Sequence, residues 1–302
     1  PPPPPPTVRY GKLPKIILPE NTGAGNLTYK LETVDGKLPK LASVGKVYFV
    51  EVNKSRLLEL DRIKAKAKTL GFTDPEKQID DQNYEFVHPT LPATLKVNVI
   101  YDQYKYKYDW TTDQDVFSKG NIRGNEQAFL QAKSFFQSLD LLAIDLTEGT
   151  PKYTYFAARP PEMIPVASLS ETDFIRVDLF RADLDKQRVV SPSANRSPVN
   201  ITFSGNQDRG KSVVEANYTY SKIVDNDYAT YPLKTVEQAW SELQQGGGYI
   251  AERGNDQITV RKVSLAYFES DDPQEFLQPV FVFEGDNGFM AYVVAITPQY
   301  QQ

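Results

Sequence analysis

The chain has 302 residues, enough for two or three domains, and its 40% hydrophobic and 24% charged residues are typical of a globular protein. It contains no Cys and a single His, which excludes a thiol nucleophile, a zinc–thiolate site and a multi-histidine metal site. The net charge of −5 gives no overall basic field, so we expect no nucleic-acid partner.

Charge is distributed unevenly along the chain. Residues 1–70 hold 13 Lys and Arg against 6 Asp and Glu, whereas residues 231–302 hold 4 against 10. Because the chain opens with six prolines and without Met, we expect a fragment whose Pro1–Pro6 form a polyproline II spacer. Such a spacer often separates a membrane anchor from a folded domain outside the membrane. The sequence has no run of about 18 apolar residues, so the expected anchor would precede this chain.

The first half of the chain predicts an extended segment followed by a helix and strands. Residues 1–42 predict an N-terminal spacer with one exposed strand over 27–34. The next predicted elements are a strand, a helix and two strands, over 46–52, 56–70, 83–87 and 95–108. Ser55 is the expected helix cap, and Gly71 the expected left-handed residue beyond the helix.

The same order of elements recurs after residue 124. Asn125 is the expected cap of a helix over 126–139, and strands are predicted over 152–157 and 173–184. The recurrence predicts repeated helix-plus-antiparallel-sheet units. Ser191–Pro198 is rich in Ser, Pro and Asn and is the expected linker or long loop.

The last third is the most explicit part of the sequence. Thr235 and Gln238 have capping-box spacing at the start of a helix. The predicted strands are 199–204, 212–222, 257–268, 277–284 and 289–296, and Gly285-Asp286-Asn287-Gly288 predicts a hairpin turn. We expect Trp240 of the helix to pack on the sheet against Phe281 and Phe283. The adjacent strand should add three side chains to that layer, namely Val263, Leu265 and Tyr267.

The fold class predicted from these elements is α+β. The expected organisation is an N-terminal segment over 1–42, an α+β domain with two helix–strand units over 43–190, and a C-terminal α+β domain over 191–302.

Residues 231–296 also carry a resemblance to a known family. They run Tyr-Pro-Leu-Lys-Thr, then Ala239-Trp240, then Leu265-Ala266-Tyr267-Phe268-Glu269, and then Gln-Pro-Val-Phe-Val-Phe-Glu-Gly over 278–285. This order resembles the C-terminal part of the YycH/YycI-type extracytoplasmic regulators of bacterial sensor kinases, which are built from PepSY-like helix-on-sheet units. The resemblance implies a membrane-anchored protein of the cell envelope without catalytic activity, which regulates a protein partner.

The densest aromatic run is the candidate binding site. Tyr104, Tyr106 and Tyr108 would share one face of a strand, with lysines on the other face, and Trp110 follows. If this row is exposed, it can bind a protein partner or a glycan. If it packs against a helix, it is part of the core.

No catalytic, metal-binding or cofactor-binding residue is assigned from the sequence. His88 follows a strand and precedes Pro89, a position typical of a turn, and no nucleophile can be placed beside it. The acidic pairs lack the ligand spacing of a calcium loop and favour turns. We therefore expect no cofactor and no metal.

Three hypotheses follow for function. The first is a non-enzymatic, extracytoplasmic, N-terminally tethered module that binds or regulates a protein partner in or at the membrane. The second is an envelope structural or glycan-binding protein. The third is a carboxylate-based hydrolase, which requires a cleft with a carboxylate of raised pKa.

Overall fold

The structure is a computed structural model that describes residues 5–20, 27–53, 55–113, 115–118 and 122–302. The chain is an α+β protein that divides into two compact units. The first unit comprises Pro1–Glu51, Asp183–Ala194 and Ser221–Gln302, and the second comprises Val52–Ala182 and Asn195–Tyr220. Within the described residues, no helix is long and apolar enough to cross a membrane.

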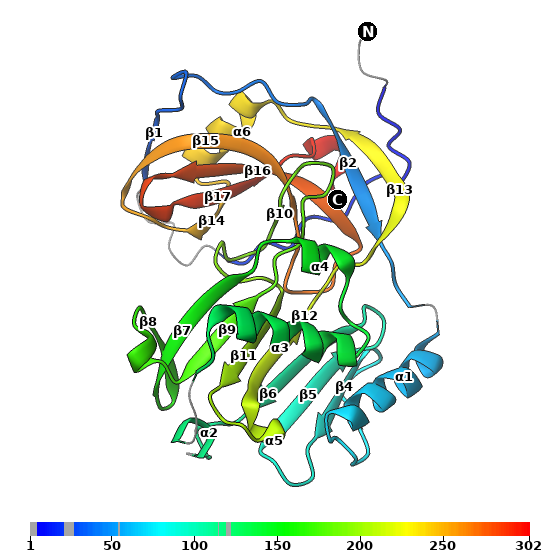
Figure 1. The fold of residues 1–302 in the computed structure, drawn as a ribbon. Coiled ribbons are helices and arrows are strands. Elements are labelled where there is room, and N and C mark those ends of the chain that lie inside the picture. The colour runs from blue at the N-terminus through cyan, green and yellow to red at the C-terminus, as the bar shows by residue number, and fades with distance from the viewer. Residues whose placement is uncertain (1–4, 21–26, 54, 114, 119–121) are drawn as a thin grey trace. The chain divides into compact units, whose positions relative to one another are not determined.

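The described residues of the second unit form a nine-stranded antiparallel sheet, in the order β3-β4-β5-β6-β12-β11-β9-β7-β8 (Figure 1). Its strands are β3 Lys77–Gln78, β4 Asn83–Val87, β5 Ala93–Asn98, β6 Gln103–Tyr108, β7 Lys152–Arg159, β8 Glu162–Val166, β9 Phe174–Asp178, β11 Val199–Ser204 and β12 Val213–Tyr218. Its helices are α1 Arg56–Thr69, α2 Asp115–Ser118, α3 Asn125–Ser138, α4 Ile144–Glu148, α5 Arg209–Ser212 and the 3-10 helix η1 Leu169–Glu171.

Helices α1 and α3 cover one face of this sheet (Figure 1). In β6 the side chains alternate between the two faces of the sheet. Tyr104, Tyr106 and Tyr108 are buried, while Lys105 and Lys107 are exposed on the other face. The helix α1 and the helix α3 are each followed along the chain by antiparallel strands, as predicted. Both sets of strands belong to one sheet, however, and do not form two separate units.

In the part of the chain that the structure describes, the first unit forms an eight-stranded sheet around β15 and β16. Its strands are β1 Thr28–Leu31, β2 Val44–Val50, β10 Val189–Val190, β13 Ile223–Pro232, β14 Tyr249–Glu252, β15 Gln257–Phe268, β16 Phe276–Gly285 and β17 Met290–Val294. Its helices are α6 Val236–Gln244 and the 3-10 helices η2 Asp286–Gly288 and η3 Pro298–Tyr300.

Helix α6 begins with the predicted capping box. The Gln238 backbone N–H donates to the Thr235 hydroxyl over 3.2 Å, and the Thr235 N–H donates to the Gln238 side chain over 2.8 Å. Two polar groups at the helix start are therefore satisfied locally. The predicted hairpin between β16 and β17 is also present, with Asn287 at a φ of 55° in its turn.

The side chains of β16 alternate between two apolar layers, as expected. Phe281 and Phe283 pack in the layer that contains α6, and the Trp240 ring lies 5.7 Å from the Phe283 ring. The opposite layer contains the valines of β16, Val280 and Val282. The expectation was wrong for Tyr267, which packs further along the sheet with Tyr48 and Leu277. The reason is the length of β15, whose C-terminal end lies beyond the part of the sheet that α6 covers.

The two units differ from the domain ranges predicted from the sequence. Strand β2 pairs with β13, which joins the start of the chain to its last third, and β10 pairs with β15. Strands β11 and β12 lie between β6 and β9 in the second unit. The predicted boundaries after residues 42 and 190 therefore do not separate the units. The predicted linker 191–198 does contain one passage between them, at Ala194–Asn195.

The described part of residues 1–42 packs against the first unit instead of forming a free spacer. Leu13 is fully buried, and the Val8 N–H donates to the Thr230 carbonyl over 3.0 Å. Strand β1 pairs in parallel with β15. Extended chain becomes ordered here because an existing sheet supplies backbone partners. Most of Pro1–Pro6 lies outside the described residues.

Two local predictions were wrong at their boundaries, and a third placed a helix cap correctly but without its side-chain hydrogen bond. The strand predicted over 95–108 is the hairpin β5–β6, because the Asn98 side chain accepts two backbone N–H groups and Asp102 adopts a φ of 52°. Helix α3 is capped by Gly124 and not by Asn125. Ser55 occupies the N-cap of α1 but makes no side-chain capping bond, and Leu57 at the start of α1 is 73% exposed.

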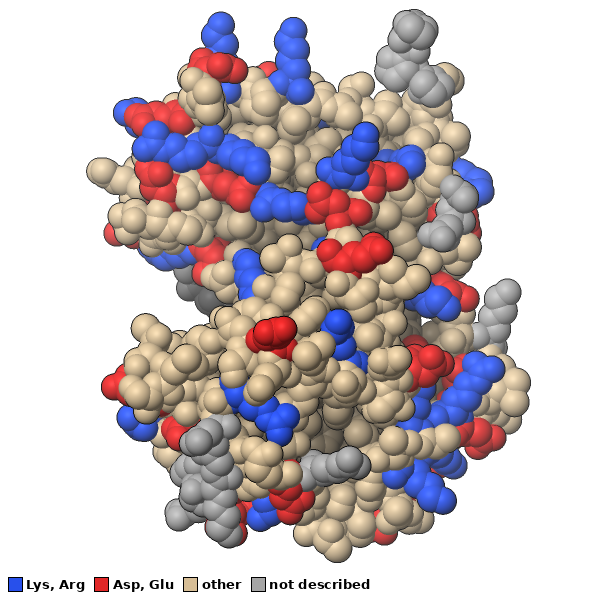
Figure 2. Space-filling model, viewed as in Figure 1, with Lys and Arg blue, Asp and Glu red and all other residues tan. Residues whose placement is uncertain are grey.

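On the face that Figure 2 shows, the described residues of the basic and acidic ends of the sequence do not form separate charged regions. Most of residues 1–70 and all of residues 231–302 belong to the first unit, where Arg261 bonds Glu32 and Asp286 over 2.7 Å each. Figure 2 shows Lys and Arg interspersed with Asp and Glu on the visible face. Interspersed charges largely cancel at a distance.

Candidate functional site

The predicted aromatic row lies in the core of the second unit and not on an exposed surface. Tyr104, Tyr106, Tyr108 and Trp110 are 5%, 8%, 0% and 7% exposed. The Tyr108 hydroxyl donates to Asp113 over 2.7 Å, and the Trp110 ring lies 5.2 Å from a neighbouring phenylalanine ring. The physical reason is that α1 and α3 cover the tyrosine face of β6. Tyr106 also lines the larger pocket described next.

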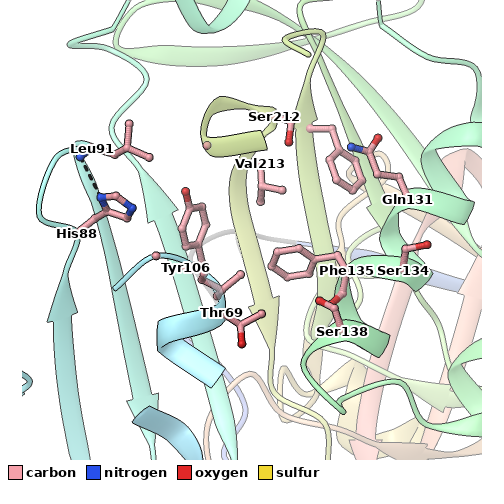
Figure 3. Close-up of a pocket in the computed structure, with 14 residues that line it drawn as sticks. Thr69, His88, Leu91, Tyr106, Gln131, Ser134, Phe135, Ser138, Ser212 and Val213 are labelled. Carbon is pink, nitrogen blue, oxygen red and sulfur yellow. Dashed lines mark hydrogen bonds between the residues drawn. The ribbon is translucent and has the colours of Figure 1, made fainter. Parts of the chain in front are cut away.

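This pocket, of about 630 Å³, lies between the C-terminal end of α1 and helix α3 (Figure 3). The turn between β4 and β5 and the segment α5–β12 contribute its other walls. Its lining residues are Thr69, Leu70, Gly71, His88, Leu91, Tyr106, Gln131, Ser134, Phe135, Ser138, Phe203, Gly210, Ser212 and Val213. A volume of this size is within the usual range of about 300–1,000 Å³ for ligand pockets.

His88 is held in one orientation at the wall of the pocket. Its Nδ1 accepts the backbone N–H of Thr90 over 3.2 Å and of Leu91 over 3.0 Å. In the neutral ring the proton therefore lies on Nε2, which makes no hydrogen bond with any residue that the structure describes. Burial lowers the pKa of His88 below its ordinary 6.5, and Asp74 opposes this effect.

A glycine makes room for this imidazole ring. Gly71 has a φ of +88°, as predicted for the residue beyond α1, and a Cβ at this position would lie 2.6 Å from Nε2 of His88. The Phe72 ring packs edge-on against His88, with centroids 5.4 Å apart, and against Tyr106, at 6.0 Å. One aromatic ring thus supports both polar side chains.

The Tyr106 hydroxyl has no hydrogen-bond partner among the described residues. Burial raises the pKa of Tyr106 to about 12, so the hydroxyl keeps its proton at neutral pH. Figure 3 shows this hydroxyl and the Nε2 side of His88 directed into the same pocket. The two groups are available to a ligand as hydrogen-bond donors.

The lining combines apolar side chains with uncharged polar ones. Phe135 lies at the centre of the view, and Ser134, Ser138 and Gln131 extend from the same helix (Figure 3). Among the described lining residues there is no Lys, Arg, Asp or Glu. The sequence analysis missed the α3 residues. These polar residues are spaced three and four positions apart, which places them on one face of a helix beside Phe135, and this spacing could have indicated a polar helix face.

The described lining of the pocket contains His88 and three serines, but it forms no hydrogen bond between a serine hydroxyl and the imidazole. No hydroxyl of the described residues bonds to Nε2 of His88, so no nucleophile–base pair is formed. The pKa of Asp178 is raised by burial, but Asp178 bonds Arg176 over 2.8 Å and the Ser197 N–H over 2.9 Å, away from this pocket. Within the described ranges, no group of three or more His, Asp or Glu side chains could hold a metal ion.

No protein-family model matches the sequence, and no curated protein matches it. The chain is similar to the crystal structure of an uncharacterized protein from Eubacterium rectale ATCC 33656, with a TM-score of 0.46 and 13% sequence identity. The similarity covers 85% of this chain and 84% of that chain.

Proposed function

We propose that this protein is a non-enzymatic binding and regulatory module that recognises a protein partner through the pocket between α1 and α3. The observation that carries the proposal is the composition of the pocket. It combines apolar walls with hydrogen-bonding groups that have no partner among the described residues, among them Nε2 of His88 and the Tyr106 hydroxyl. Sites with few polar groups in an apolar wall are typical of recognition.

The proposed setting is outside the cytoplasm of a bacterium, with the partner in or at the membrane and a tether before Pro1. The resemblance of residues 231–296 to the YycH/YycI-type regulators supports this setting. Helix α6 on strands β15–β17 is the kind of helix-on-sheet unit from which those proteins are built.

The two other hypotheses have less support. Glycan binding was tied to an exposed aromatic row, and that row is buried. A carboxylate-based hydrolase requires an acidic side chain in a cleft, and the described lining of this pocket has none.

Site-specific photo-cross-linking in cells tests the proposal. A photoreactive amino acid replaces Ser134, an exposed residue at the pocket, and in a matched variant it replaces Ile144, which is 75% exposed on α4. We expect a discrete adduct with one other protein at position 134 and none at position 144. If position 134 gives no adduct, or if both positions give the same adduct, the proposal is wrong.

A further inference from the structure

Two hydrogen-bond donors on aromatic rings in the pocket, Nε2 of His88 and the Tyr106 hydroxyl, have no acceptor among the described residues, and they indicate the chemistry of the ligand that the pocket binds. The Nδ1 atom of His88 is occupied by two backbone N–H groups, so its free ring nitrogen carries the proton. The Tyr106 hydroxyl is the second free donor among the described residues. Phe72 contacts both rings edge-on and fixes their positions.

We infer that the pocket binds an uncharged, largely apolar group through a carbonyl oxygen that accepts hydrogen bonds from His88 and Tyr106. This inference rests on the assignment of the pocket as the recognition site in the proposed function. A carbonyl oxygen has two lone pairs and can accept from both donors at once. An occupant that covers these donors displaces water from them, so an occupant with a matching oxygen is favoured over a purely apolar one.

The absence of charge in the described lining sets the second requirement. An ionised group that enters the pocket would lose its hydration, and none of the described lining residues offers an opposite charge. Apolar atoms next to the carbonyl would instead contact Phe135, Leu91 and Val213, which face the same space (Figure 3). The pocket should therefore discriminate strongly between neutral and charged members of one ligand series.

The same chemistry can come from two sources. An apolar residue of a protein partner offers a side chain and a backbone carbonyl, and a free acyl amide offers a hydrocarbon chain and a carbonyl. Titration calorimetry with two matched pairs separates them. The pairs are N-acetyl-L-phenylalaninamide with N-acetyl-L-phenylalanine, and octanamide with octanoate, each at neutral pH.

We expect the neutral member of at least one pair to bind at least about tenfold more tightly than its carboxylate. Preference for the phenylalanine amide identifies the partner's peptide as the source, and preference for octanamide identifies a free acyl compound. Equal binding of neutral and charged members, or no binding of either neutral compound at millimolar concentration, would overturn the inference.

Variants at one hydroxyl test the hydrogen bond itself. Tyr106→Phe should weaken binding of the neutral compound about three- to tenfold. Because this hydroxyl has no partner among the described residues, its removal should not lower the melting temperature. Tyr153→Phe, the same change at a residue of β7 outside the pocket lining, should leave binding unchanged.

An unchanged affinity in Tyr106→Phe would overturn the assigned hydrogen bond. These measurements use no partner protein, so their failure is distinguishable from failure of the proposed function. An adduct at position 134 together with equal binding of neutral and charged compounds would reject only the ligand chemistry.

Discussion

The Nδ1 atom of His88 accepts a hydrogen bond from the backbone N–H of Leu91 over 3.0 Å, and both side chains line the same pocket. The imidazole therefore holds the turn between β4 and β5 in place. The Thr90 N–H also donates to this atom. A proton on Nδ1 would therefore face the N–H groups of Thr90 and Leu91 and would break both hydrogen bonds. The neutral form of the ring is the form that fits this turn.

This geometry predicts a pH dependence of stability. The pKa of His88 is lowered by burial from its ordinary value of 6.5, so the unfolded chain takes up this proton before the folded protein does. The contribution to the free energy of unfolding is therefore complete above pH 6.5 and is lost as the pH falls through the lowered pKa. Urea unfolding between pH 7 and pH 5 should show that the free energy of unfolding falls more steeply with decreasing pH in the parent than in His88→Gln. Identical slopes would contradict the prediction.

Gly71 should tolerate a side chain less well than a glycine with the same backbone conformation. Gly71→Ala adds a Cβ 2.6 Å from Nε2 of His88, whereas Gly246, at a φ of +81° beyond α6, has nothing within 4 Å. Each change costs about 1–2 kcal/mol for the left-handed conformation. Gly71→Ala should lower the free energy of unfolding by at least about 1 kcal/mol more than Gly246→Ala does, and it should weaken ligand binding. Equal losses in denaturant unfolding would show that the His88 ring moves freely aside.

A buried ion pair in the second unit depends on Asp145. The Arg181 side chain is 4% exposed and donates from Nε to Asp145 over 2.7 Å, and the Tyr220 hydroxyl donates to the other carboxylate oxygen over 3.0 Å. Asp145→Asn should lower the free energy of unfolding by about 2–4 kcal/mol, because the buried Arg181 guanidinium loses the negative charge that its Nε contacts at 2.7 Å.

The matched variant in this cluster is Tyr220→Phe. It removes one hydroxyl but keeps the ring that lies 4.2 Å from the Arg181 guanidinium, so it should cost about 0.5–1.5 kcal/mol. Denaturant unfolding of both variants measures the difference. If Tyr220→Phe lowers the free energy of unfolding more than Asp145→Asn does, the ion pair of Asp145 and Arg181 is not the dominant interaction in this cluster.

Trp240 should be a major contributor to the first unit. Its half-buried ring contacts Phe283 at 5.7 Å and Tyr29 at 6.1 Å. Trp240→Ala should lower the free energy of unfolding by about 2–4 kcal/mol, slightly less than for a fully buried tryptophan. Gln244→Ala on the exposed face of α6 should change it by less than about 0.5 kcal/mol. Denaturant melts that cannot distinguish the two variants would refute this packing.

Pro165 should protect the free edge of the sheet in the second unit. Its register partner Phe156 directs its carbonyl toward β9, where it accepts the Asp173 N–H over 2.8 Å, so Pro165 directs its backbone outward from β8. Pro165→Val would add an outward N–H and lower by about fivefold the concentration at which the protein self-associates. Sedimentation velocity should detect this, with Met163→Val as the control that keeps the proline. Equal association of both variants would count against the role of Pro165.

The sequence by itself determined the features that depend on neighbours within one element. The capping box of Thr235 and Gln238, the left-handed Gly71 and the alternation of Phe281 and Val282 between two layers are local properties of the backbone. Their physics involves residues at most a few positions apart, so spacing alone predicts them.

Only the tertiary structure decided which faces are buried and which residues meet. Alternation places Tyr104, Tyr106 and Tyr108 on one face of β6, but it does not say that α1 and α3 cover that face. The pocket likewise depends on α3 and β12, which follow His88 by about forty residues or more. Burial of a face is determined by contacts between elements distant in the chain, and the free energy of those contacts is absent from any local window of sequence.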